Sequence, residues 1–157
     1  MRSKVLGDRK FASVPFMFSA KEDEENPSSF GLLFIAEDSI MYHYGFSIKS
    51  RTIESEWLIV YYTKRPSMLF ERYKDETGKT VFSFGQQFKK TTENGGRFLS
   101  FISQGLSDDC LFITEAAARG VIACLEVVRW FQNKLVIIPA GGVRHGLNPL
   151  FRNTETE

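Results

Sequence analysis

The chain has 157 residues, of which 43% are hydrophobic and 14% aromatic, and this is enough to build the core of one ordinary domain. Twenty Lys and Arg against 19 Asp and Glu leave a formal net charge of +1. Composition therefore excludes a whole-chain field that would draw the protein onto nucleic acid or an anionic membrane, and any contact with a polyanion has to be local.

The apolar runs are short. The longest, 58–62 and 135–139, fall far below the roughly 18 to 20 residues that are needed to cross a bilayer. Residues 1–10 mix charges with single apolar residues and do not form the hydrophobic region of a signal peptide. We therefore expect a cytoplasmic protein with no membrane partner.

Residues 30–84 predict an antiparallel meander of about five strands, at 30–36, 40–48, 53–62, 68–73 and 80–84. A charged segment with Pro27 leads into the first strand. The clearest signal is the second strand, where bulky residues recur with a period of two: Ile40, Tyr42, Tyr44, Phe46 and Ile48. Gly78 can supply the positive φ that a hairpin loop between the last two strands needs.

The pattern becomes helical after Gly85. Residues 88–97 are basic and glycine-rich, with a break at 94–96, and 98–104 form a short apolar element that the pattern does not assign. Residues 108–133 predict one long amphipathic helix with Ser107 as its N-cap and Gly120 as a bend or a site of close packing. Its apolar stripe comprises Ile113, Ala117, Val121, Cys124, Val128 and Phe131.

A short final strand is predicted at 135–138, where Pro139 stops it, and a tail follows over 140–157. The fold class is therefore α+β: a meander of about five strands, a long amphipathic helix and a short final strand. No repeat or low-complexity linker divides the chain, so 1–157 is expected to form a single domain.

Neither cysteine predicts a disulfide or a metal site. Cys110 and Cys124 are separated by about 21 Å if both lie on the predicted helix, at roughly 1.5 Å per residue, and cannot pair there. No second pair of Cys or His lies nearby to complete a zinc site. We expect two buried, reduced thiols and no metal.

A nucleotide-binding loop has only a partial match. Gly78-Lys79-Thr80 has the last three letters of the phosphate-binding P-loop, but Tyr73 occupies the place of its first glycine. The three residues also follow a predicted strand in a hairpin rather than opening a helix. A turn is the favoured interpretation.

Acid–base chemistry has few candidate residues. His43 lies on a strand face, and His145 lies in the tail without an adjacent Asp or Cys. Glu54 and Glu56 share one face of a predicted strand, which is the minimum for an acid and a base. A self-sufficient enzyme would bring His43, Glu54 and His145 together in a cleft, and this is the weakest of our hypotheses.

A local nucleic-acid site is a further alternative. Between 88 and 101, three cations lie among three phenylalanines, which combines charge with stacking surface. A solvated basic loop beside core aromatics is the favoured interpretation. The residues are Lys89, Lys90, Arg97, Phe88, Phe98 and Phe101.

Seven short motifs, in this order and spacing, resemble the middle of bacterial and archaeal AAA family ATP-binding proteins of the ABC-like class, relatives of the RecF and overcoming-lysogenisation-defect ATPases. The resemblance covers roughly 14–138. The motifs are Val14-Pro15-Phe16, Pro27-Ser28-Ser29-Phe30, Tyr42-His43-Tyr44-Gly45-Phe46, Glu56-Trp57-Leu58, Leu69-Phe70-Glu71-Arg72, Phe98-Leu99-Ser100 and Trp130-Phe131.

The resemblance implies the antiparallel β part of an ATPase head and the helix that follows it. In that family the Walker A loop lies upstream of this region, and the signature, the Walker B acid and the switch histidine lie downstream. The segment therefore matches no catalytic, nucleotide-binding or metal-binding position, and ATP and Mg²⁺ are implied only for the complete domain. The resemblance therefore implies a truncated gene product, a split-gene partner or an excised fragment.

The partners that the resemblance implies are the rest of an ATPase head or a full-length relative, with a homo-oligomer as a further expectation. Nucleic acid is an implied partner of the complete ATPase system, since relatives act in DNA repair or phage defence. The alternative is a stand-alone binding module that docks on a full-length ATPase or on another protein.

Overall fold

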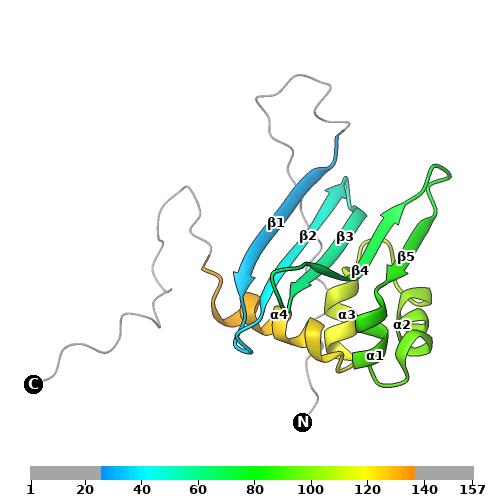
Figure 1. The fold of residues 1–157 in the computed structure, drawn as a ribbon. Coiled ribbons are helices and arrows are strands. Elements are labelled where there is room, and N and C mark those ends of the chain that lie inside the picture. Colours follow the sequence, from blue (N-terminus) through cyan, green and yellow to red (C-terminus); the bar gives the residue numbers. More distant parts are fainter. Residues whose placement is uncertain (1–25, 137–157) are drawn as a thin grey trace, which may run out of the picture.

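The computed structural model describes residues 26–136. Its sheet has five antiparallel strands in chain order, β1 (Ser28–Ile35), β2 (Met41–Lys49), β3 (Thr52–Tyr61), β4 (Ser67–Lys74) and β5 (Thr80–Phe84), as Figure 1 shows. Four helices follow: α1 (Gln86–Thr91), α2 (Gly95–Gln104), α3 (Phe112–Ala118) and α4 (Ile122–Asn133). The α+β class and the meander are confirmed.

The period of two in the sequence divides the sheet into two faces. Tyr44 lies opposite Leu32 on β1 and Leu58 on β3, and this face forms the core. His43 lies opposite Leu33 and Ile59 on the other face, which we call the outer face. Alternation therefore places the predicted stripe of β2 against the helices.

Two register shifts change the alternation locally. One lies between Ser47 and Ile48 in the pairing of β2 with β3, and as a result Ile53 and Glu56, three residues apart, are both fully buried. The other lies between Leu58 and Ile59 in the pairing of β3 with β4. Glu56 shares the core face with Leu58 and Val60 by regular alternation, and the first shift turns Ile53 to the same face.

Helices cover the core face of the sheet (Figure 1), and aromatic side chains make several of the contacts. The ring of Phe34 on β1 stacks on Trp130 of α4 with centroids 4.1 Å apart. At the other end, Phe70 on β4 meets Phe112 of α3 edge to face at 4.8 Å. Such pairs contribute about 0.5–1.5 kcal/mol each beyond the area they bury.

The single helix predicted over 108–133 is wrong, because the chain forms α3 and α4 with a sharp break at Gly120. This glycine has φ +81°, its N–H donates to the carbonyl of Ala117, and the N–H of Val121 donates to that of Ala116. These bonds make a Schellman motif, which ends a helix at a residue in the left-handed region. The predicted stripe persists through the break, since Ile113, Ala117, Val121 and Cys124 are buried.

The predicted N-cap is also wrong. α3 begins at Phe112 rather than at 108, and Ser107 bonds instead to the side chain of Asp109. The unassigned segment 98–104 is most of α2, which begins at Gly95 after a residue with φ 57°, Asn94. Leu135 and Val136 form no strand, and the rest of the predicted final strand and the tail lie outside the described residues. Among 26–136, none of the helices is both long and apolar enough to cross a membrane.

We expect Gly120→Ala to lower the free energy of unfolding by about 1 kcal/mol, because a side chain at positive φ is strained even where space is open. Gly105→Ala is the matched control, since Gly105 follows α2 with φ −91° and ψ 1°, which alanine adopts. Urea denaturation of both variants measures the difference. Equal stability of the two variants would contradict the Schellman assignment.

Candidate functional site

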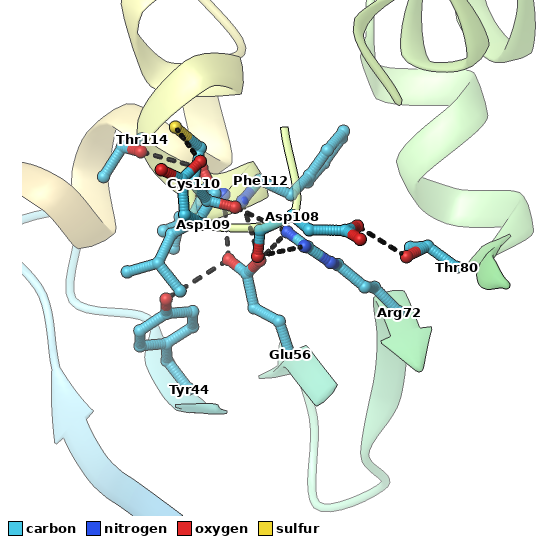
Figure 2. A network of polar contacts seen from close by, with 11 residues as sticks. Tyr44, Glu56, Arg72, Thr80, Asp108, Asp109, Cys110, Phe112 and Thr114 are labelled. Carbon is cyan, nitrogen blue, oxygen red and sulfur yellow. Dashed lines mark hydrogen bonds and ion pairs between the residues drawn. The ribbon is translucent and has the colours of Figure 1, made fainter. Parts of the chain in front are cut away.

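The acid–base candidate Glu56 lies at the centre of a buried polar network (Figure 2). Its Oε2 accepts the N–H of Phe112 at 2.7 Å, and its Oε1 accepts the N–H of Ile113 at 2.9 Å. The hydroxyl of Tyr44 donates to Oε1 at 3.2 Å. A carboxylate from the sheet thus caps the N-terminus of α3, which has no cap from its own side chains.

Arg72 is the cation beside this carboxylate. Its Nη1 lies 3.6 Å from Oε2 of Glu56, and the two residues lie directly opposite each other on β3 and β4. Nη1 also donates to the carbonyl of Cys110 at 2.6 Å, and Nη2 donates to that of Asp108 at 3.3 Å. Arg72 therefore ties the segment before α3 to the sheet (Figure 2).

Burial and the polar contacts of the network shift the pKa of Glu56 in opposite directions. Burial raises the pKa of Glu56 to about 7, although the two backbone N–H donors, Arg72 and Tyr44 favour the ionised form. Burial, with the Glu56 carboxylate beside it, also raises the pKa of the Tyr44 phenol well above its ordinary value. Tyr44 accordingly remains a neutral donor at neutral pH.

This arrangement fits a structural role for Glu56. Its oxygens are engaged by three donors and a cation, and the side chain is fully buried, so no substrate reaches it. Glu54, the other carboxylate of the expected pair, is half-buried at the register shift and is not among the partners of Glu56. The acid–base pair expected on one strand face does not form.

The remaining chemical candidates are scattered. His43 lies on the outer face with its ring edge to face with Trp57, centroids 6.2 Å apart, and His145 lies outside the described residues. Gly78 has φ +77° in the β4–β5 hairpin, where Asp75 Oδ1 accepts the N–H groups of Thr77 and Lys79. The turn interpretation of Gly78-Lys79-Thr80 is confirmed.

The two cysteines differ in their exposure to solvent. Cys124 is fully buried and free, as expected, whereas Cys110 is free but exposed and lies before α3, which corrects the prediction for that residue. Burial raises the pKa of the Cys124 thiol well above its ordinary value, and partial desolvation, with Asp109 beside it, raises the pKa of the Cys110 thiol. Both thiols therefore remain largely protonated at neutral pH. Within residues 26–136, no group of three or more His, Cys, Asp and Glu side chains is arranged to hold a metal ion.

The strongest surface feature is β1, the strand at one edge of the sheet. It pairs only with β2 among the described strands, and its eight residues include no charged side chain and no proline. Natural edge strands usually carry such residues because they block pairing with another chain. Large hydrophobic side chains are exposed on both of its faces: Phe30 52%, Leu32 36%, Leu33 59% and Ile35 63%.

The exposed side chains of β1 continue across the sheet. On the outer face, Leu33 lies in the same cross-strand row as His43, Ile59 and Met68, of which Met68 is 37% exposed. α1, α3 and α4 pack on the opposite face (Figure 1). We call β1 with this row the β1 surface. Sequence reasoning found the strand but missed the surface, and the absence of charge over 28–35 is the signal that could have found it.

In comparisons with protein-family models, curated proteins and solved structures, nothing matches this chain.

We expect stability to fall as pH rises from about 5 to 8. The folded chain holds a proton on Glu56 up to about pH 7, whereas the unfolded chain releases it near the ordinary value of 4.5, so unfolding releases a proton in this window. The free energy of unfolding should drop by up to about 3 kcal/mol. Urea denaturation at each pH measures it, and the same series on Glu56→Gln should lose this slope; a rising wild-type curve contradicts the assignment.

The pair Glu56 and Arg72 should behave as a unit. We expect Arg72→Met to cost about 3–5 kcal/mol, because it leaves a carboxylate buried without its cation. The double variant Glu56→Gln, Arg72→Met should be more stable than the sum of the two single losses predicts. A double-mutant cycle at pH 8 measures the coupling, and strictly additive losses would rule out a direct interaction.

Proposed function

We propose that this chain is the antiparallel β part of an ABC-like ATPase head, that it does not hydrolyse ATP by itself, and that its role is to assemble with the remainder of such a head through the β1 surface. The observation that carries the proposal is the uncharged edge strand with four exposed large hydrophobic side chains. The order of motifs that resembles the ATPase family gives the class of partner.

The chemistry of β1 favours a protein partner. An unpaired edge offers a row of N–H and C=O groups, and another strand can satisfy them by extending the sheet. The side chains of Leu33 and Ile35 on the outer face, and those of Phe30 and Leu32 on the core face, would be covered from both sides in such a complex. Burial of apolar area of this kind contributes roughly 25 cal/mol per Å² before the costs of association.

Phosphoryl transfer needs a phosphate cradle, Mg²⁺ and an acid that orients water. The described residues most like a cradle, Gly78-Lys79-Thr80, form a hairpin turn in which two backbone N–H groups are already bonded to Asp75. ATP and Mg²⁺ would accordingly be held by other segments of the head, in the same polypeptide or in another. The family relatives give the proposed context, which is DNA repair or phage defence.

A stand-alone binding module is the second candidate function. It is favoured by the closed core, in which the Glu56 network satisfies the N-terminus of α3 within the chain. Such a module would use the same β1 surface to dock on a full-length ATPase. The two candidates differ in whether the partner is active before the chain binds.

The first test is ATP binding and hydrolysis by the purified 157-residue chain with Mg²⁺, measured by calorimetry and phosphate release against a boiled control. We expect neither binding nor hydrolysis. Specific ATP turnover by the chain alone would overturn the proposal.

The second test measures binding to a full-length ABC-like ATPase by surface plasmon resonance. We expect Leu33→Lys with Ile35→Lys to weaken binding at least tenfold, because a partner strand would bury both charges. Ile122→Lys on α4 is the matched control, since Ile122 is 70% exposed and lies away from β1, and it should bind like wild type. Equal binding by all three proteins would exclude the β1 surface.

A further inference from the structure

β5 and α2 lie at the edge of the sheet opposite to β1 (Figure 1). Residues of both elements line a groove there. It comprises a larger cavity of about 780 Å³ and a smaller one of about 350 Å³, and the two adjoin because they share three lining residues, Phe82, Ser103 and Gln104. We call this pair of cavities the β5–α2 groove. It is separate from the β1 surface on which the proposed function rests.

The groove is cationic although the chain is nearly neutral. Lys89 and Arg97 line the larger cavity, Lys79 and Arg72 line the smaller one, and no Asp or Glu lines either. Lys79, Lys89 and Arg97 form no ion pair with the described residues. Lys79 interacts electrostatically with Asp75 of the hairpin turn, whereas Lys89 and Arg97 line the larger cavity without an acidic residue in its lining. Cations in both cavities make a local site for a polyanion.

The side chain of Lys89 lies beside the N-terminus of α2. A side chain on Gly95 would come within 2.9 Å of the Lys89 carbonyl oxygen, and one on Gly96 would lie 3.7 Å from the Lys89 stem. Asn94 makes no side-chain bond to the first N–H groups of α2. The Lys89 stem therefore lies beside the first turn of α2, and Lys89, Gly96 and Arg97 all line the larger cavity. The positive end of the helix dipole adds to the cationic charge there.

An exposed aromatic ring completes the larger cavity. Phe101 lines it and is 62% exposed, although Leu99 and Ile102 on the same helix are buried. The guanidinium of Arg119 lies over the Phe101 ring, 5.5 Å from its centroid. An aromatic ring in a cationic groove stacks on nucleobases without preference for sequence.

The smaller cavity contains a further hydrogen-bond donor, Arg72. Arg72 lines it, and its Nε is buried without a hydrogen-bond partner among the described residues. The hydroxyl of Thr80 and the amide of Gln104 line the same cavity. The Thr80 hydroxyl already donates to Asp108 Oδ1 at 2.9 Å, so Gln104 and the Arg72 guanidinium are the donors for an oxyanion in this cavity.

We propose that the β5–α2 groove binds single-stranded nucleic acid, with Lys79, Lys89 and Arg97 on the phosphates and Phe101 stacked on a base. Two adjoining cavities with cations in both suit a chain of phosphates better than one small anion. The exposed ring favours nucleic acid over an acidic peptide, which has no base to stack. The three cations and Phe101 are thus assigned to contacts with the ligand.

The test uses fluorescence anisotropy of a labelled 20-nucleotide oligothymidylate with the 157-residue chain at 50 and 200 mM salt. We expect binding that weakens steeply with salt, since each neutralised phosphate adds about 0.7 to the slope of log affinity against log salt. Lys89→Glu with Arg97→Glu should weaken binding at least tenfold and reduce that slope. Phe101→Ala should weaken it about tenfold without changing the slope.

The matched control is Lys49→Glu with Arg51→Glu. Both residues are exposed in the β2–β3 region, form no ion pair with the described residues and do not line the groove, while the charge change is the same. Control binding equal to wild type supports the site, and circular dichroism melts verify that each variant is folded.

Three results would overturn the proposal. The first is no binding at 50 mM salt. The second is an equal loss in the groove and control variants, which would mean attraction by net charge alone. The third is full competition by polyglutamate together with no effect of Phe101→Ala, which would assign the groove to an acidic protein segment. None of these readouts depends on an ATPase partner, so this proposal and the proposed function can fail separately.

Discussion

The buried pair of Glu56 and Arg72 is the interaction on which the rest of the fold depends. The two side chains face each other on neighbouring strands, and each then reaches out of the sheet: the carboxylate to the first N–H groups of α3, the guanidinium to the carbonyls of Asp108 and Cys110. Burial opposes the charge on Glu56, and Arg72 is one of the groups that favour its ionised form. Together they satisfy backbone groups that a helix start would otherwise leave unpaired in an apolar environment, and they hold the helical layer at one position on the sheet.

The sequence predicts what depends on local periodicity. The alternation around Tyr42 and Tyr44 indicates the strand and its buried face, and Gly78 indicates a turn, because these signals need only near neighbours. The cap of α3 could not be predicted, since Glu56 lies 56 residues before Phe112 and is joined to it only by folding. The sequence indicates a bend or a site of close packing at Gly120, but the apolar stripe continues across this residue and so suggests one helix. The exposed state of β1 is a tertiary property that alternation does not report.

The two surfaces proposed for binding lie at opposite edges of the sheet, with β1 at one and β5 at the other. Their chemistry is as different as their positions. The β1 surface has exposed Leu33 and Ile35 and no charge along its strand, whereas the β5–α2 groove has Lys89 and Arg97 without acidic neighbours in its lining. A protein partner on one edge therefore leaves the other edge open, and a chain of this shape can connect an assembly with a polyanion without either ligand excluding the other.

The strand order, which follows the chain order, also has a kinetic consequence. Each strand pairs with the one synthesised just before it, through turns of a few residues, so the sheet closes only small loops as it forms. The contact from Glu56 to Phe112 closes a far larger loop and should therefore form late. During synthesis, β1 emerges before the other four described strands, and none of these strands covers its free edge at any of these steps. A partner that pairs with β1 could thus bind a nascent chain whose helical layer is not yet in place.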